Sequence, residues 1–175
     1  MRMMRYWIGI AACLCLLNCS PAFAQLTAHE LYNRGVRYIQ DGNLEAALSD
    51  FNQTIKYDPK YADAYYNRAY VYTKLNDFES ALQDYDRTVE LNDKNAEYLL
   101  MRGNAYYFLD RYPEALLDYT RAIEIDTSNA QPYFYRGITL LEYGEDADGC
   151  IDLKKAAAKG FFNAKRAYSD YCGGD

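Results

Sequence analysis

The sequence is short of the residues and motifs on which enzymes most often depend. It contains a single histidine, His29, near the start of the repetitive part of the chain. It has no HExxH metal-binding motif and no glycine-rich loop that could hold a phosphate group. Carboxylates are plentiful, but they follow a repeat and face solvent by pattern. We therefore expect neither a catalytic site nor a bound cofactor.

Long apolar runs and an excess of positive charge are also missing. A permanent membrane-spanning helix needs about 20 apolar residues in succession, and the sequence has no such run. The formal net charge is −6, which disfavours binding to nucleic-acid backbones and to anionic lipid head groups. Half of the residues are nevertheless apolar, which excludes a disordered chain.

The first 24 residues have the three parts of a signal peptide. Arg2 and Arg5 form a positive segment, residues 6–17 are apolar, and residues 22–24 (Ala-Phe-Ala) have the pattern of a cleavage site. Residues 1–24 are therefore predicted to be removed. Loss of Arg2 and Arg5 changes the formal charge from −6 to −8. We expect export, to the periplasm if the host is Gram-negative and otherwise by secretion.

Two other interpretations of this segment are a membrane anchor, which its short apolar core disfavours, and a lipidated cysteine. Cys13 and Cys19 each end a sequence that partly resembles a lipobox, so a lipoprotein remains the alternative. Cleavage after residue 24 would remove Cys13, Cys15 and Cys19 and leave Cys150 and Cys172. A pair of cysteines in an exported chain favours a disulfide bond, with two buried free thiols as the alternative.

The chain repeats itself with a period of 34 residues. Arginine and aspartate each recur at this spacing, and a glycine or an alanine directly follows each arginine. An aromatic residue or a leucine recurs four positions after the arginine. The arginines are Arg34, Arg68, Arg102 and Arg136, and the aspartates are Asp50, Asp84, Asp118 and Asp152.

These residues and spacings resemble the tetratricopeptide-repeat (TPR) family over residues 28 to about 163. The resemblance implies an all-α, right-handed superhelix (an α-solenoid) of four helix-turn-helix units with a concave binding surface. The units are expected at residues 28–61, 62–95, 96–129 and 130–163. The fourth is degenerate, because Gly149 and Leu153 replace a recurring alanine and a recurring aromatic residue. Residues 163–172 are predicted to form a helix that caps the solenoid.

Local signals agree with two helices in each unit. Thr27 and Glu30 form a capping box for the first helix. Residues 41–43, residues 76–77 and Asp110 carry turn signals between the two helices of the first three units. Small residues next to the arginines should allow the paired helices to approach closely; they are Gly35, Ala69, Gly103 and Gly137.

The arginine and aspartate series are interpreted as structural ion pairs rather than as ligand-binding groups. The turn inside the first unit puts Arg34 level with Asp50, while the turn after it puts Asp50 level with Arg68. The sequence does not choose between these two partners. In either case, bidentate pairs would fix how the helices pack more than they would add net stability.

A cluster of acids at one turn is the strongest candidate for a metal site. The ligand spacing of an EF-hand is absent there, and acids are also favoured at the start of a helix. We therefore expect no metal at this cluster, which consists of Glu142, Glu145, Asp146 and Asp148.

The sequence contains 20 tyrosines, more than core packing alone explains. Some recur at the core phase of the first helix in each unit, whereas others occupy the opposite phase together with asparagines. In the TPR family this opposite phase lines the concave groove. Tyrosine offers a large apolar face and a hydroxyl group, which suits a binding surface. The expected groove residues are Tyr32, Tyr66, Asn67, Tyr70, Asn104, Tyr107, Phe108, Phe134 and Tyr135.

The expected function is a non-enzymatic protein-interaction scaffold of the cell envelope, with a neutral or basic protein segment as its partner. An alternative is a structural subunit that uses the same surface for self-association or envelope assembly. One TPR subset binds the acidic tails of cytosolic chaperones through lysines, asparagines and an arginine. Those tails are not expected here, because four of the matching positions carry Tyr32, Val36, Glu97 and Met101.

Overall fold

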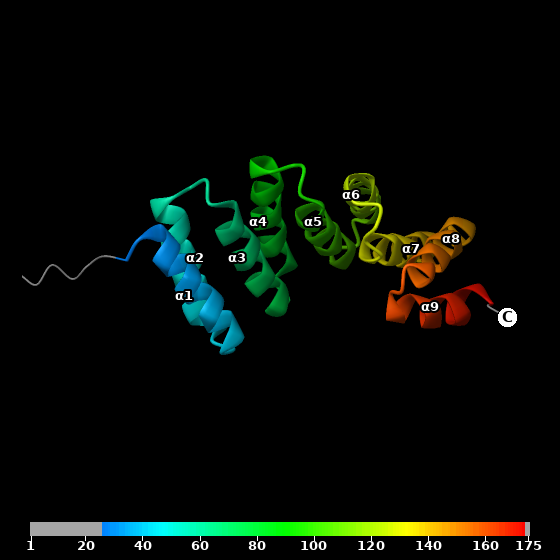
Figure 1. Ribbon diagram of the computed structural model, residues 1–175, viewed down its shortest axis with the longest axis horizontal. Coiled ribbons are helices and arrows are strands. Elements are labelled where there is room, and N and C mark those ends of the chain that lie inside the picture. The colour runs from blue at the N-terminus through cyan, green and yellow to red at the C-terminus, as the bar shows by residue number, and fades with distance from the viewer. Residues whose placement is uncertain (1–25, 174–175) are drawn as a thin grey trace, which may run out of the picture.

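The computed structural model describes residues 26–173, so the predicted signal peptide at residues 1–24 lies outside the described residues. The described residues form nine α-helices and no strand, arranged in an elongated, curved row (Figure 1). The expected all-α solenoid is thereby confirmed. Within residues 26–173, no helix is both long enough and apolar enough to cross a membrane.

Each expected unit contains two helices. They are α1 (Ala28–Gln40) with α2 (Leu44–Tyr57), α3 (Ala62–Lys74) with α4 (Phe78–Leu91), α5 (Ala96–Phe108) with α6 (Tyr112–Ile125), and α7 (Gln131–Tyr143) with α8 (Asp146–Ala158), followed by α9 (Phe162–Cys172). Every helix packs against the next one along the chain, and α1 also contacts α3 while α5 contacts α7. These additional contacts place the first helices of the units on the inner side of the curve.

The turn inside every unit has a left-handed residue at the same position of the 34-residue period. Gly42 has φ +76°, Asn76 +59°, Asp110 +56° and Gly144 +90°. Glycine adopts this conformation freely, and asparagine and aspartate tolerate it better than other residues do. The turn signals in the sequence therefore mark positions that the backbone requires.

The start of α1 is fixed by the predicted capping box. The Thr27 hydroxyl accepts a hydrogen bond from the Glu30 backbone, and the Glu30 carboxylate accepts one from the Thr27 backbone. The second of these bonds is the main reason why the pKa of Glu30 is lowered. Thr27 and Glu30 thus satisfy backbone groups at the N-terminus of the first helix, as the sequence predicted.

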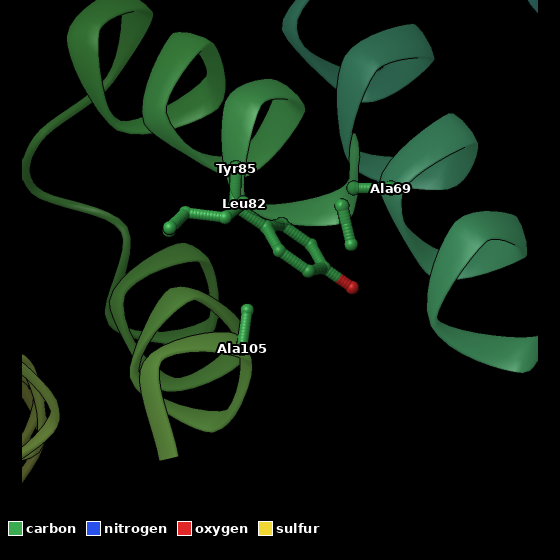
Figure 2. Close-up of a cluster of buried hydrophobic side chains, with 5 residues drawn as sticks. Ala69, Leu82, Tyr85 and Ala105 are labelled. Carbon is green, nitrogen blue, oxygen red and sulfur yellow. The ribbon is translucent and has the colours of Figure 1, made fainter. Parts of the chain in front are cut away.

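The core repeats with the units. One large side chain from the second helix of each unit is fully buried: Phe51, Tyr85, Tyr119 and Leu153. The Tyr85 ring, on α4, lies between Ala69 of α3 and Ala105 of α5 (Figure 2). A Cβ atom on Gly103 would come within 2.6 Å of the Tyr119 ring. The small residues beside the arginines therefore make room for these side chains, and each such burial contributes about 1.5–3 kcal/mol.

The fourth unit also packs a buried side chain against a small residue, but with different residue types. A Cβ atom on Gly149 would lie 2.9 Å from the carbonyl oxygen of Gly137 and 2.8 Å from Leu141 Cγ. Two facing glycines therefore let α7 and α8 approach closely, and Leu153 replaces the ring. The loss of the recurring alanine reflects this closer approach.

Candidate protein-binding face

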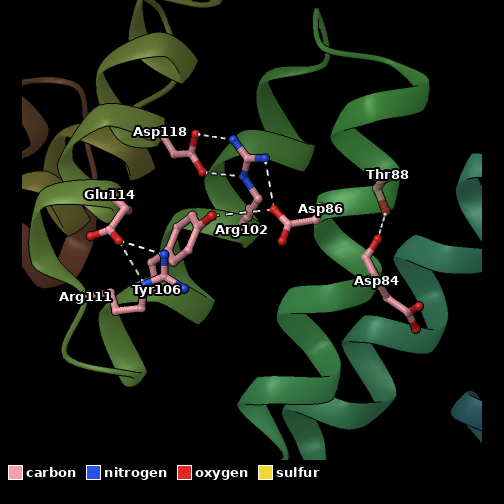
Figure 3. Close-up of polar contacts among 8 residues, drawn as sticks. All are labelled: Asp84, Asp86, Thr88, Arg102, Tyr106, Arg111, Glu114 and Asp118. Atoms are coloured by element: carbon pink, nitrogen blue, oxygen red, sulfur yellow. Dashed lines mark hydrogen bonds and ion pairs between the residues drawn. The ribbon is translucent and has the colours of Figure 1, made fainter.

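The repeated arginines and aspartates position the helices that form the inner face. Each arginine forms a bidentate ion pair with the aspartate 16 residues after it. The arginine Nε and Nη2 groups donate to the two carboxylate oxygens. For Arg102 and Asp118 the two distances are 2.6 and 2.7 Å (Figure 3). The hydrogen bond to Asp118 is the largest cause of the raised pKa of Arg102. The pairs therefore join the two helices of one unit.

The third guanidinium nitrogen joins each unit to the one before it. Nη1 of Arg68 donates to Asn52, Nη1 of Arg102 donates to Asp86 at 3.1 Å, and Nη1 of Arg136 donates to Thr120 at 2.9 Å. These acceptors lie on the second helix of the preceding unit, two residues after its aspartate. The choice that the sequence left open is resolved: the aspartate belongs to the same unit, and a different residue contacts the next arginine.

Side chains on the inner face link neighbouring first helices directly. Asn67 of α3 donates to the Tyr32 hydroxyl of α1, and the Tyr66 hydroxyl donates to Glu97 of α5. The Tyr98 hydroxyl of α5 donates back to Asp63 of α3. Burial is the main reason why the pKa values of Tyr66 and Tyr98 are raised, and the acceptor carboxylates raise them further. The first three units therefore present a fixed polar and aromatic surface.

Several predicted groove residues take part in this packing. The Tyr32 ring lies 5.0 Å from the Tyr61 ring, and the Tyr66 ring lies 5.3 Å from the Tyr98 ring. Asn67 also donates to the backbone carbonyl of Asp63. Part of the surface of these rings is thus used for packing rather than left free for a ligand.

Two further predicted residues also make contacts within the protein. The Lys74 ammonium group lies 5.1 Å from the centre of the Tyr70 ring. Asn104 accepts a hydrogen bond of 2.9 Å from the hydroxyl of the buried Tyr119. The side-chain oxygen of Asn104, a predicted groove residue, is therefore already used to support a core tyrosine.

The predicted residues of the last two units separate into two groups. Tyr135 packs at 6.2 Å on the Tyr119 ring of the third unit, and Phe134 packs at 4.8 Å on Phe161, the residue before α9, so both rings are used in packing. Tyr107 and Phe108 instead lie at the end of α5, where Phe108 is 56% exposed. The structure thus brings the predicted residues onto one row of helices but leaves their exposure very uneven.

Sequence reasoning missed two sets of residues on or beside this face. Tyr61 and Tyr98 lie at unit boundaries and stack on predicted groove tyrosines. Phe78 and Tyr112 are the first residues of α4 and α6 and lie 34 residues apart. That spacing was a usable signal for the second pair, because an aromatic residue at the start of a second helix points toward the neighbouring unit.

Comparison with protein families shows which family the chain belongs to. A family profile described as a tetratricopeptide repeat matches residues 62–95, and one described as a TPR repeat matches residues 35–76 and 103–144. The matches together cover more than half of the sequence. The chain belongs to the tetratricopeptide-repeat family. No curated protein sequence matches this TPR chain significantly.

Solved structures with the same fold include a crystal structure of MamA, with a TM-score of 0.76 and 20% identity over 83% of this TPR chain and 82% of MamA. The TPR protein TTC0263 of Thermus thermophilus has a TM-score of 0.69 and 22% identity over 83% of this chain and 81% of its own. The first TPR of Spaghetti (RPAP3), bound to the HSP90 peptide SRMEEVD, has a TM-score of 0.66 and 25% identity, covering 67% and 94%.

Proposed function

We propose that this TPR chain is a non-catalytic scaffold that binds a segment of another protein along its inner face. The observation that carries the proposal is the row of half-buried tyrosines on α1, α3 and α5, which side chains of the neighbouring first helix hold in place. A surface that is already fixed loses little conformational entropy on binding. The peptide in the similar Spaghetti structure supports this kind of partner.

The size of the inner face suits a short segment. Neighbouring helices lie about 10 Å apart, so the four first helices offer a groove of roughly 40 Å. An extended segment of about a dozen residues would fill that length at ~3.3 Å per residue. The partner is therefore proposed to present one continuous stretch of chain rather than a broad folded surface.

The charge of the inner face favours a neutral or basic partner. Asp63 and Glu97 both lie on first helices, where they accept hydrogen bonds from tyrosines. These carboxylates would repel an acidic peptide such as SRMEEVD. We therefore propose a different ligand from the one in the Spaghetti structure.

We also propose that the chain works outside the cytoplasm, after removal of residues 1–24. The proposal rests on the signal-like sequence and agrees with a cysteine pair that is close enough to be oxidised. Mass spectrometry of the native protein tests it. We expect an N-terminus at Gln25; an N-terminus at Met1 would contradict export, and a diacylated cysteine would support the lipoprotein alternative.

Paired substitutions test the binding face. Tyr70→Ala combined with Tyr107→Ala should remove most of the partners that the mature chain captures from a cell-envelope extract. Leu117→Ala combined with Ile151→Ala is the control, because these exposed residues lie on α6 and α8, away from the first helices. Circular dichroism checks that both variants fold. If the tyrosine variant folds and captures the same partners as the wild type, the inner face is not the binding site.

A second candidate function is a structural subunit that binds copies of itself. Phe162, at the start of α9, is 90% exposed, which is unusual for a large apolar side chain on a monomer. Light scattering separates the two functions. A closed oligomer that persists on dilution would favour the structural subunit, and a monomer would favour the scaffold.

A further inference from the structure

A continuous strip of aromatic rings runs along the edge of the solenoid where the turns inside the units lie. The Phe78 and Phe108 rings are nearly parallel, with centres 4.6 Å apart, and Phe108 lies 5.5 Å from Tyr107. Tyr107 lies 5.8 Å from Tyr112, which lies 6.5 Å from Tyr143. These five residues, here called the turn-edge strip, come from α4, α5, α6 and α7. The strip therefore crosses three units without a break.

The turn-edge strip is open to solvent at several points. Phe108 is 56% exposed and Tyr143 is 53% exposed. Tyr171 of α9, which is 65% exposed, lies close enough to Tyr107 that its phenol contributes to raising the pKa of Tyr107. Neighbouring exposed rings of this kind mark interaction sites on soluble proteins.

Carboxylates flank the rings of the strip. Asp110 accepts a hydrogen bond of 3.0 Å from the Tyr112 hydroxyl, and this bond is the largest cause of the raised pKa of Tyr112. The pKa of Tyr107 is raised mainly by burial, next by the charge of Glu142, and then by Tyr171 and Asp110. Both acids therefore lie within electrostatic reach of the aromatic rings.

The two edges of the solenoid differ in charge. The turns inside the units (residues 37–45, 74–79, 110–114 and 142–148) contain three Lys or Arg residues and ten Asp or Glu residues. The turns that follow each unit (residues 56–63, 90–97, 124–131 and 158–165) contain five Lys or Arg residues and seven Asp or Glu residues. The negative charge of the described chain is thus concentrated on the edge that carries the aromatic strip.

We propose that the turn-edge strip binds arginine side chains of the partner segment, which rests on the proposed function of the inner face. A guanidinium group stacks on aromatic rings and pairs with carboxylates at the same time, and the strip offers both. The protein already makes this arrangement within itself: the Arg111 guanidinium lies 4.6 Å from the centre of the Tyr106 ring and donates to Glu114 (Figure 3).

Two other occupants are less well supported. Within residues 26–173, no three His, Cys, Asp or Glu side chains are placed so that they could hold a metal ion together, so a bound metal ion is not favoured. A second copy of the chain could supply cations from its own C-terminal end, where Lys165 and Arg166 line a hollow together with the exposed Phe162. That occupant would make the strip a self-association surface, and the experiment below separates it from a partner segment.

The test uses fluorescence polarisation with the mature chain and a fluorescein-labelled peptide in which four arginines alternate with glycine and serine. A matched peptide carries citrulline in place of arginine, which keeps the shape and removes the charge. We expect the arginine peptide to bind at least about tenfold more tightly than the citrulline peptide, and more weakly as salt is added. Equal affinity for the two peptides would overturn the proposal.

Two charge-matched variants locate the site. Asp110→Asn combined with Glu142→Gln should weaken binding of the arginine peptide about tenfold. Glu124→Gln combined with Asp126→Asn, which removes the same charge from the opposite edge, should leave the affinity unchanged. Equal weakening by both variants would mean that the general acidity of the surface, rather than the strip, attracts the peptide.

Sedimentation velocity of the unliganded chain completes the test. A concentration-dependent dimer that Asp110→Asn with Glu142→Gln abolishes would assign the strip to a second copy and would overturn the proposal. The inner-face function is tested separately by Tyr70→Ala alone, because Tyr107 belongs to the turn-edge strip. If the arginine peptide does not bind but the wild-type chain still captures partners through the inner face, only the present inference falls.

Discussion

At the scale of single residues, the repeated arginines do more than their spacing indicates. The period of 34 residues predicts that arginine and aspartate pair, because both series are complete in all four units. It does not predict the third contact, because the acceptors are Asn52, Asp86 and Thr120, which share no chemical type. The equivalent residue in the last unit is Lys154, and the next position of the arginine series is Asp170. A contact made by unlike residues leaves no trace in a repeat pattern.

Replacing arginine with lysine should show the value of the third contact. Arg102→Lys keeps the charge but loses the planar fork that joins α4, α5 and α6, so we expect a loss of about 1–3 kcal/mol in the free energy of unfolding. Arg34→Lys is the matched control: Arg34 belongs to the first unit, and its side chain is 38% exposed, against 16% for Arg102. Urea unfolding followed by circular dichroism measures both. Equal losses would contradict a role in joining units.

At the scale of helices, the sequence predicted well which helices exist and in what order. It predicted poorly which side chains contact each other between units. Turn residues, the capping box and the apolar periods are local signals, and the helix ends follow them closely. The partners of Tyr66 and Asn104 depend on how neighbouring units are rotated, and no local signal encodes that rotation. The same limit hid the stacking of Phe78 on Phe108.

The last helix offers a prediction at this scale. The structure places Cys150 of α8 at bonding distance from Cys172 at the end of α9, with a Cα–Cα distance of 5.7 Å and a sequence separation of 22. We expect the bond to stabilise the chain by about 3 kcal/mol, because it restricts the unfolded state and ties α9 to α8. Cys150→Ser with Cys172→Ser should therefore lower the urea midpoint and speed amide exchange in α9. Two free thiols in the unreduced, denatured native protein would rule the bond out.

At the scale of the whole molecule, the tyrosines tie the stability of the solenoid to pH. Burial is the largest cause of the raised pKa of Tyr66, Tyr85, Tyr98 and Tyr119, and for Tyr85 the value is about 12. In the unfolded chain these groups ionise near their ordinary value of about 10. Between pH 10 and 12 the unfolded state therefore loses protons that the folded state keeps. Stability is fully present below pH 10 and is lost as the pH rises toward the folded value.

The size of this loss can be measured and assigned to one residue. A single tyrosine that stays protonated only when folded costs about 1.4 kcal/mol of stability for each pH unit above 10. We expect the urea midpoint to fall steeply between pH 10 and 12. Lysines titrate in the same range, so Tyr85→Phe is the control; Phe51 fills the same place in the first unit, which indicates that the ring fits without its hydroxyl. The variant should lose less stability than the wild type over this range. Equal slopes for the two proteins would mean that Tyr85 ionises in the folded chain as readily as in the unfolded one.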